Sequence, residues 1–214
     1  MEGMPKEVLD EAASALSKVL SASGIRHAMC GGYLAVTLGV EDRETQDIDC
    51  IVEGGFRSVI KALSIQKETF TLLPGLTSDV LVALFKSHTG IEVKIELLQS
   101  GVFGPIRLTR SNTMTIKGVP FLSPTEYVRT KVKAWVSRRY GRDMWDVLWM
   151  LRNTDGLDVD RINPAGGLDD MAKEYRDIRT LWAAMKDADE SDFEPEEEEE
   201  EEEDDDEDDE DDDE

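Results

Sequence analysis

Apolar residues recur at helical spacing near the start of the chain. Between Pro5 and Ser23 they form one stripe, which predicts an amphipathic helix: Val8, Leu9, Ala12, Ala13, Leu16, Val19 and Leu20. Gly24 is suited to end this helix in a left-handed conformation. The run from Ile25 to Cys30 then predicts a short strand, followed by a break at Gly31-Gly32 and a short helix from Tyr33 to Leu38.

A strict alternation marks the middle of the chain. From Ile91 to Leu98, every second residue is apolar, and Glu92, Lys94 and Glu96 fall on the opposite face. This pattern predicts a strand with one buried side, paired in a hairpin with residues 80–85. Further strands are expected over residues 48–52 and 113–116, with a helix over residues 56–65.

The second half of the chain has helical patterning. Ser123-Pro124-Thr125-Glu126 is typical of a helix start, and helices are expected over residues 126–139, 143–152 and 168–186. Four tryptophans fall within the apolar stripes, and we expect all of them in the core: Trp135, Trp145, Trp149 and Trp182. The element order predicts an α+β fold, with a small mixed β-sheet, flanking helices and a helical C-terminal half.

The charge of the chain is concentrated at its end. The formal net charge is −24, but residues 1–186 contain 24 basic and 24 acidic residues, and the other 24 acidic residues lie in 187–214. We expect residues 1–120 to form a catalytic core, 121–186 a helical region and 187–214 a disordered acidic tail. The tail could be a solubilising extension, bind a basic partner, or fold back over the basic residues between Lys131 and Arg142.

The chain contains no apolar run of about 18 residues, which excludes a membrane span, and it does not open with an export signal. Its two cysteines, Cys30 and Cys50, are expected to be reduced core thiols. We therefore expect an intracellular protein, in the cytoplasm or the nucleus.

Two acids and two glycines carry the candidate chemistry. Asp47 and Asp49 flank Ile48 on a predicted strand, so both carboxylates project from one face, where hard oxygen ligands suit Mg²⁺ or Mn²⁺. Gly31-Gly32 allows close approach of a phosphate to the backbone at a helix start. A third carboxylate is expected from the neighbouring strand, where Glu96, near its end, is the first candidate and Glu92 the second. Both lie on the same polar face, so alternation alone does not choose between them.

The spacing of these residues resembles the signature of the nucleotidyltransferase superfamily. Gly-Gly is followed after fourteen residues by Asp-Ile-Asp, which Arg43-Glu44-Thr45-Gln46 precedes. The pattern is most similar to small members related to abortive-infection toxin nucleotidyltransferases, and less so to aminoglycoside and lincosamide nucleotidyltransferases. The resemblance implies catalytic metal ligands at Asp47, Asp49 and Glu96, with the triphosphate at Gly31 and Gly32.

A second segment continues the resemblance. Residues 130–148 are similar to a Lys-x-x-Ala…Arg…Asp-x-x-Asp segment of the toxin-like group, which implies that Lys131 and either Asp143 or Asp146 face the nucleotide. Arg43 and Thr45 complete the candidate nucleotide site, where we expect them to shape the turn before the aspartates. The basic run from Arg129 to Arg142 is either a solvated helix surface or a phosphate-binding wall for a triphosphate or RNA.

These residues predict a Mg²⁺-dependent nucleotidyltransferase that moves a nucleoside monophosphate from an NTP to an acceptor. RNA ends, protein side chains and small molecules all remain open as acceptors. The alternative is a catalytically inactive member of the fold. It would bind a nucleotide or a partner protein, and its acidic tail would serve as an interaction segment.

Overall fold

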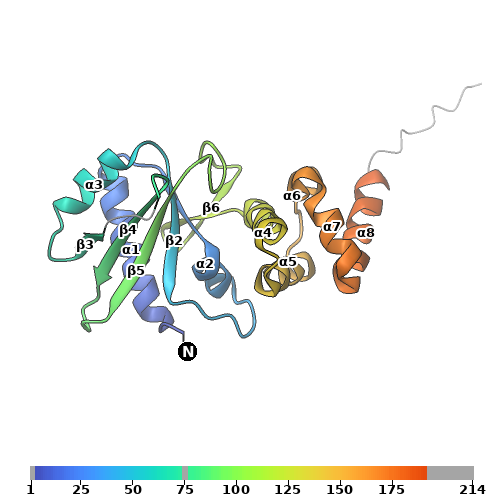
Figure 1. The fold of residues 1–214 in the computed structure, drawn as a ribbon, viewed down its shortest axis with the longest axis horizontal. Coiled ribbons are helices and arrows are strands. Elements are labelled where there is room, and N and C mark those ends of the chain that lie inside the picture. The colour runs from blue at the N-terminus through green and yellow to red at the C-terminus, as the bar shows by residue number, and fades with distance from the viewer. Residues whose placement is uncertain (1–2, 74–76, 192–214) are drawn as a thin grey trace, which may run out of the picture.

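Among the residues that the structure describes, a mixed seven-stranded sheet runs through the first half of the molecule (Figure 1). The computed structural model describes residues 3–73 and 77–191. The sheet order is β3-β4-β5-β2-β1-β7-β6. The strands are β1 (His27–Cys30), β2 (Asp47–Val52), β3 (Phe70–Leu73), β4 (Val80–Lys86), β5 (Glu92–Gln99), β6 (Thr113–Ile116) and β7 (Val119–Leu122).

In the described part of the chain, α1, α2 and α3 accompany the sheet, and the later helices form a separate layer beside it (Figure 1). Helix α1 packs on α3 and on strands β1, β2, β5 and β7, whereas α2 packs on β1 and β2. In the helical half, α4 contacts α5, α6 and α7, and α8 contacts α5, α6 and α7. The helices are α1 (Lys6–Ala22), α2 (Gly31–Leu38), α3 (Phe56–Ser64), α4 (Pro124–Arg138), α5 (Gly141–Asn153), α6 (Val159–Ile162), α7 (Gly167–Glu174) and α8 (Arg176–Ser191).

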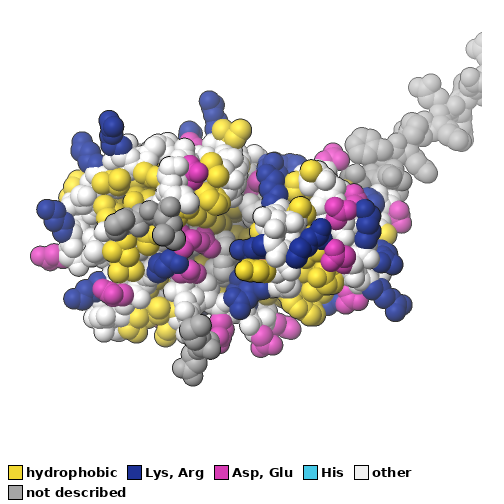
Figure 2. Space-filling model, viewed as in Figure 1, with side chains coloured by type: hydrophobic (Ala, Val, Ile, Leu, Met, Phe, Trp, Pro, Cys, Tyr) yellow, Lys and Arg dark blue, Asp and Glu magenta, His cyan; other side chains and the backbone are white. Residues whose placement is uncertain are grey.

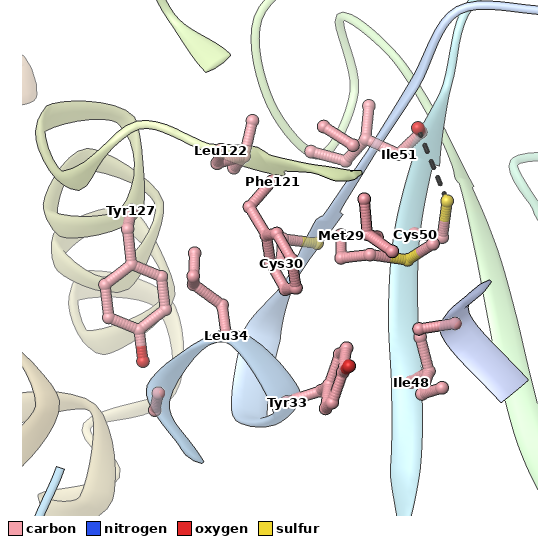
Figure 3. Close-up of a cluster of buried hydrophobic side chains, with 14 of the residues drawn as sticks. Met29, Cys30, Tyr33, Leu34, Ile48, Cys50, Ile51, Phe121, Leu122 and Tyr127 are labelled. Carbon is pink, nitrogen blue, oxygen red and sulfur yellow. Dashed lines mark hydrogen bonds between the residues drawn. The ribbon is translucent and has the colours of Figure 1, made fainter. Parts of the chain in front are cut away.

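Strand β2 lies at the centre of the sheet and is anchored by its apolar residues. It pairs antiparallel with β1 and parallel with β5. Figure 3 shows a core cluster beside it, to which β1, β2, α2, β7 and α4 contribute buried side chains: Met29, Cys30, Tyr33, Leu34, Ile48, Cys50, Ile51, Phe121, Leu122 and Tyr127. Both cysteines are unpaired and buried, and burial raises the pKa of each thiol. Because Ile48 and Cys50 fill this core, their neighbours Asp47 and Asp49 project from the other face.

The structure confirms most of the predicted elements. Gly24 has a φ of 68°, the left-handed conformation expected at the end of α1. The Ser123 hydroxyl accepts a hydrogen bond from the Glu126 amide at the start of α4. Residues 31–38 form the predicted short helix, although it already begins at Gly31, so the two glycines are its first residues rather than a separate turn.

Several predictions were wrong. The helix expected over 168–186 is two helices, because Tyr175 has extended backbone between α7 and α8. Strands β3 and β7 and helix α6 were not predicted. Helix α8 continues to Ser191, so residues 187–191 of the predicted tail are helical, and residues 192–214 lie outside the described part of the chain.

Trp145 is not a core residue, contrary to prediction. It is 61% exposed, whereas Trp135 and Trp182 are buried as expected. Two aspartates of the same helix, Asp143 and Asp146, take buried positions instead. Within the described residues, no helix has the length and apolar character needed to cross a membrane.

Candidate active site

Three carboxylates share the polar face of the central strands. The parallel register of β2 and β5 places Asp49 opposite Glu96 and Asp47 opposite Lys94. Adjacent strands are about 4.8 Å apart, so the carboxylates of Asp49 and Glu96 can take ligands in common. Glu92 lies four residues before Glu96, at the start of β5, where it pairs with Lys86 of β4 and is exposed. The structure therefore brings Glu96 next to the aspartates and leaves Glu92 away from them.

Gly31 makes room for Asp49. A Cβ atom at Gly31 would lie 1.8 Å from Asp49 Oδ2, and the glycine has a φ of 62°, which side chains rarely adopt. A Cβ at Gly32 would lie 2.6 Å from Thr45 Oγ1. The two glycines thus form a cradle for the side chains of the β2 site, in addition to exposing backbone at the start of α2.

The environment of Asp49 disfavours the negative charge of its carboxylate, which a bound cation would offset. Burial, together with the neighbouring charges of Asp47 and Glu96, raises the pKa of Asp49 to about 6. Lys131 and Lys94 act in the opposite direction but do not cancel these effects. Carboxylate oxygens on one sheet face, seated over a glycine cradle, are hard donors that fit Mg²⁺ or Mn²⁺ in their chemistry.

A lysine contacts two of these three carboxylates. The Lys94 ammonium lies 2.6 Å from Glu96 Oε1 and 3.5 Å from Asp47 Oδ2. In residues 3–73 and 77–191, no three His, Cys, Asp or Glu side chains converge closely enough to hold a metal ion in their present positions. Glu96 is thus turned toward the lysine rather than into a common site with both aspartates.

A buried ion-pair cluster on α4 and α5 lies across the pocket from these strands, and we call it the facing wall. The Lys131 ammonium lies 2.7 Å from Asp146 Oδ2 and 3.3 Å from Asp143 Oδ1. Asp143 also accepts two hydrogen bonds from Arg138. Burial would raise the pKa of Asp143, but the hydrogen bonds from Arg138 and the charge of Lys131 outweigh it and lower the pKa. Lys131 and both aspartates therefore bind one another in this wall.

The turn before β2 links the two walls. Arg43 donates to Asp146 on α5 and to the backbone oxygen of Glu44. The Thr45 hydroxyl donates to Asp47 Oδ1 over 3.1 Å. These contacts make Arg43 and Thr45 shape the approach to the aspartate pair.

A pocket of about 650 Å³ lies between the walls. Its lining comes from α2, the 43–47 turn, β2 and the junction of α4 and α5: Gly32, Arg43, Thr45, Asp47, Asp49, Lys131, Arg138, Arg139, Tyr140, Gly141, Arg142 and Asp143. Asp146 lines the neighbouring pocket instead. Figure 2 shows acidic side chains at the edge of the sheet half, with Lys and Arg side chains facing them from the helical half.

Three lining residues differ in how far their charge is already paired. Arg138 binds Asp143, and Arg139 lies 2.6 Å from Glu174. Arg142 is exposed and has no ion-pair partner among the residues that the structure describes. Arg142 is therefore the cation of this wall that is open to an anionic ligand.

The sequence did not single out three residues of the site, of which Gly141 lines the pocket at the start of α5. Lys94 could have been found, because alternation places it on the polar face of the predicted strand between Glu92 and Glu96. Tyr140, whose ring lies 5.0 Å from the Arg138 guanidinium, carried no signal in the sequence.

A mixed sheet with paired acids on its central strands, facing a helical layer, is the arrangement that the sequence predicted for a nucleotidyltransferase. The model of the family described as "Nucleotidyl transferase AbiEii toxin, Type IV TA system" matches residues 14–214, and the chain belongs to this family. The enzyme class predicted from the sequence is thus confirmed. A comparison with curated proteins returns no match.

Solved structures share the fold. An antigenic nucleotidyltransferase-like protein from Paracoccidioides brasiliensis is 20% identical, with a TM-score of 0.61 over 83% of this chain and 93% of its own. JHP933 from Helicobacter pylori is 16% identical, with a TM-score of 0.54 over 85% of this chain and 81% of its own. At these identities the likeness establishes the fold alone.

Proposed function

We propose that this chain is an active, Mg²⁺- or Mn²⁺-dependent enzyme that transfers a nucleoside monophosphate from an NTP to an acceptor. One observation carries the proposal: Asp47, Asp49 and Glu96 share one sheet face, opposite a pocket wall with an open cation at Arg142. This arrangement provides oxygen ligands on one side and positive charge for a triphosphate on the other.

Each residue has a role in this proposal. Asp47 and Asp49 would hold the metal, and Glu96 is a further ligand or the base for the acceptor hydroxyl. A bound divalent ion would supply Lewis-acid stabilisation of the charge that develops on the phosphoryl oxygens. The backbone at Gly31-Gly32 and the Arg142 guanidinium receive the triphosphate, while Lys131, Asp143 and Asp146 keep the facing wall in place.

The surface beside the pocket favours a nucleic-acid end among the acceptors. A groove of about 390 Å³ runs along α4, and its lining includes the exposed Lys133 and Phe103. Arg129 and Arg138 also line it, each paired with an acid, Glu126 and Asp143 respectively. Cations with a neighbouring aromatic ring suit the phosphates and bases of a single strand. Arg138 lines both this groove and the active-site pocket, so a strand in the groove leads toward the carboxylates.

The proposal is tested by incubating the full chain with NTPs labelled at the α-phosphate, Mg²⁺ or Mn²⁺, and separate RNA, protein and small-molecule acceptor pools. We expect label on the RNA pool, and its loss in Asp47→Ala and in Asp49→Ala. Asp160→Ala, an exposed aspartate on α6, is the matched control and should retain transfer.

Two results contradict the proposal in different ways. Label on the protein or small-molecule pool alone overturns the RNA acceptor but keeps the enzyme. Nucleotide binding that survives both aspartate changes, with no transfer to any pool by the unchanged protein, indicates the inactive binding protein instead.

A further inference from the structure

The two lysines of the active site, Lys94 and Lys131, differ in exposure and in the acids that they contact. Lys131 is 9% exposed and is held between Asp143 and Asp146 on the facing wall. Lys94 is 45% exposed and contacts Asp47 and Glu96 directly, on the β-strand that carries Glu96. Of these two cations, only Lys94 has both a direct contact with the site carboxylates and the freedom to leave them.

The contacts of Lys94 explain why the three acids do not converge. The side chain of Lys94 projects from the same face as Glu96, two residues away, and its ammonium draws Glu96 Oε1 to 2.6 Å. It also reaches Asp47, its register partner on β2. A long and flexible lysine stem can withdraw its ammonium into water at small energetic cost, because a half-exposed ion pair contributes little to stability.

We propose that Lys94 is the resident counter-ion of the metal site. Its ammonium neutralises Asp47 and Glu96 in the metal-free protein and must leave both carboxylates before they take a divalent cation. Lys94 thereby sets the metal affinity of the site and reduces, without removing, the repulsion between the acids in the metal-free protein. The inference rests on the proposed function, because it takes Asp47 and Glu96 to be metal ligands.

The test is titration of Mn²⁺ alone into the full chain, without nucleotide, with free Mn²⁺ measured by electron paramagnetic resonance. Lys94→Met should bind Mn²⁺ about five- to tenfold more tightly, because a competing ion pair of modest strength is removed. Lys94→Arg keeps the charge and should bind no more tightly than the unchanged protein. In EDTA, Lys94→Met should melt at a lower temperature, and Mn²⁺ should raise its melting temperature by more.

Lys86→Met is the matched control. Lys86 is an exposed lysine on the neighbouring strand, opposite Glu92, and its loss changes the net charge equally. Its Mn²⁺ affinity should stay at the original value. Equal tightening in both variants, or an affinity of Lys94→Met at or below that of the unchanged protein, overturns the inference. Lys94→Gln provides the same test with a polar side chain should the methionine variant fail to fold.

Asp47→Asn separates this inference from the proposed function. If that change abolishes Mn²⁺ binding but Lys94→Met leaves the affinity unaltered, only the counter-ion role fails. If Mn²⁺ binds equally well without the Asp47 carboxylate, the metal site itself is wrong, and the inference about Lys94 fails with it.

Discussion

The two walls of the pocket use aspartate in opposite ways. On β2, burial and the neighbouring carboxylates raise the pKa of Asp49 to about 6. On α5, the pKa of Asp143 is lowered, because Arg138 and Lys131 more than offset the effect of its burial. Asp143, with arginine and lysine partners, stabilises the wall that it belongs to. Asp49, beside other acids, is repelled by them, and a bound cation would reduce this repulsion. The comparison separates the candidate catalytic acids from the structural ones.

The largest expected effect is on transfer, at the third carboxylate of the β2 wall. Glu96→Gln should lower the rate about 100- to 1000-fold, because several kcal/mol of charge stabilisation depend on a complete ligand set. Glu92→Gln removes the same charge at the far end of β5 and should leave the rate unaltered. Single-turnover transfer from a labelled NTP measures both. Equal losses would show that the register of β2 and β5 does not select the third acid.

The facing wall should respond in stability. Lys131→Met leaves two buried aspartates with one cationic partner fewer, and should lower the free energy of unfolding by about 3 kcal/mol. Lys133→Met, an exposed lysine on the same helix, should change it little. Urea unfolding followed by circular dichroism compares them. If Lys131→Met retains full stability and loses only nucleotide affinity, Lys131 is a triphosphate ligand rather than part of the wall.

Gly31 should combine both kinds of effect. Gly31→Ala and Gly24→Ala both place a side chain at positive φ and should each cost about 1–2 kcal/mol of stability. Only the first also drives a Cβ atom into Asp49, since nothing lies within 4 Å of a Cβ at Gly24. Transfer should therefore fail in Gly31→Ala alone. Loss of transfer in both variants would indicate general damage to the fold.

The smallest expected effect is on the pH dependence of stability, which tests whether the ionised Asp49 carboxylate destabilises the fold. The folded chain holds the Asp49 proton more tightly than the unfolded chain, so the carboxylate destabilises the fold above pH 6, and this penalty disappears as the pH falls below 3.8. In EDTA at pH 8, Asp49→Asn should raise the free energy of unfolding by about 1 kcal/mol, allowing for screening by solvent. The advantage should be absent below pH 3.8. A less stable variant at pH 8 would contradict it.

The fold and the aspartate pair could be predicted because they depend on local patterns. Alternation around Ile48 is enough to place both carboxylates on one face, and the capping residues at Ser123 are enough to begin α4. The break at Tyr175 was missed because neither a proline nor a glycine marks it in the sequence. Strand β3 was missed because it depends on pairing with β4, which is not a local pattern.

The choice of the third acid lay beyond local patterns. Glu92 and Glu96 lie on the same face of β5, and only the pairing of β5 with β2 distinguishes them. Trp145 was misplaced for a related reason. The ion pairs with Lys131 and Arg138 draw Asp143 into the interior, so the apolar stripe of α5 does not show which side is buried.

The most direct test of the proposed site is a crystal structure of the full chain with Mn²⁺ and a non-hydrolysable NTP analogue, in which anomalous scattering locates the metal. We predict an anomalous peak coordinated by Asp47, Asp49 and Glu96, with the triphosphate between this peak and Arg142. A triphosphate bound outside this pocket, or Mn²⁺ coordinated by other residues, would contradict the account.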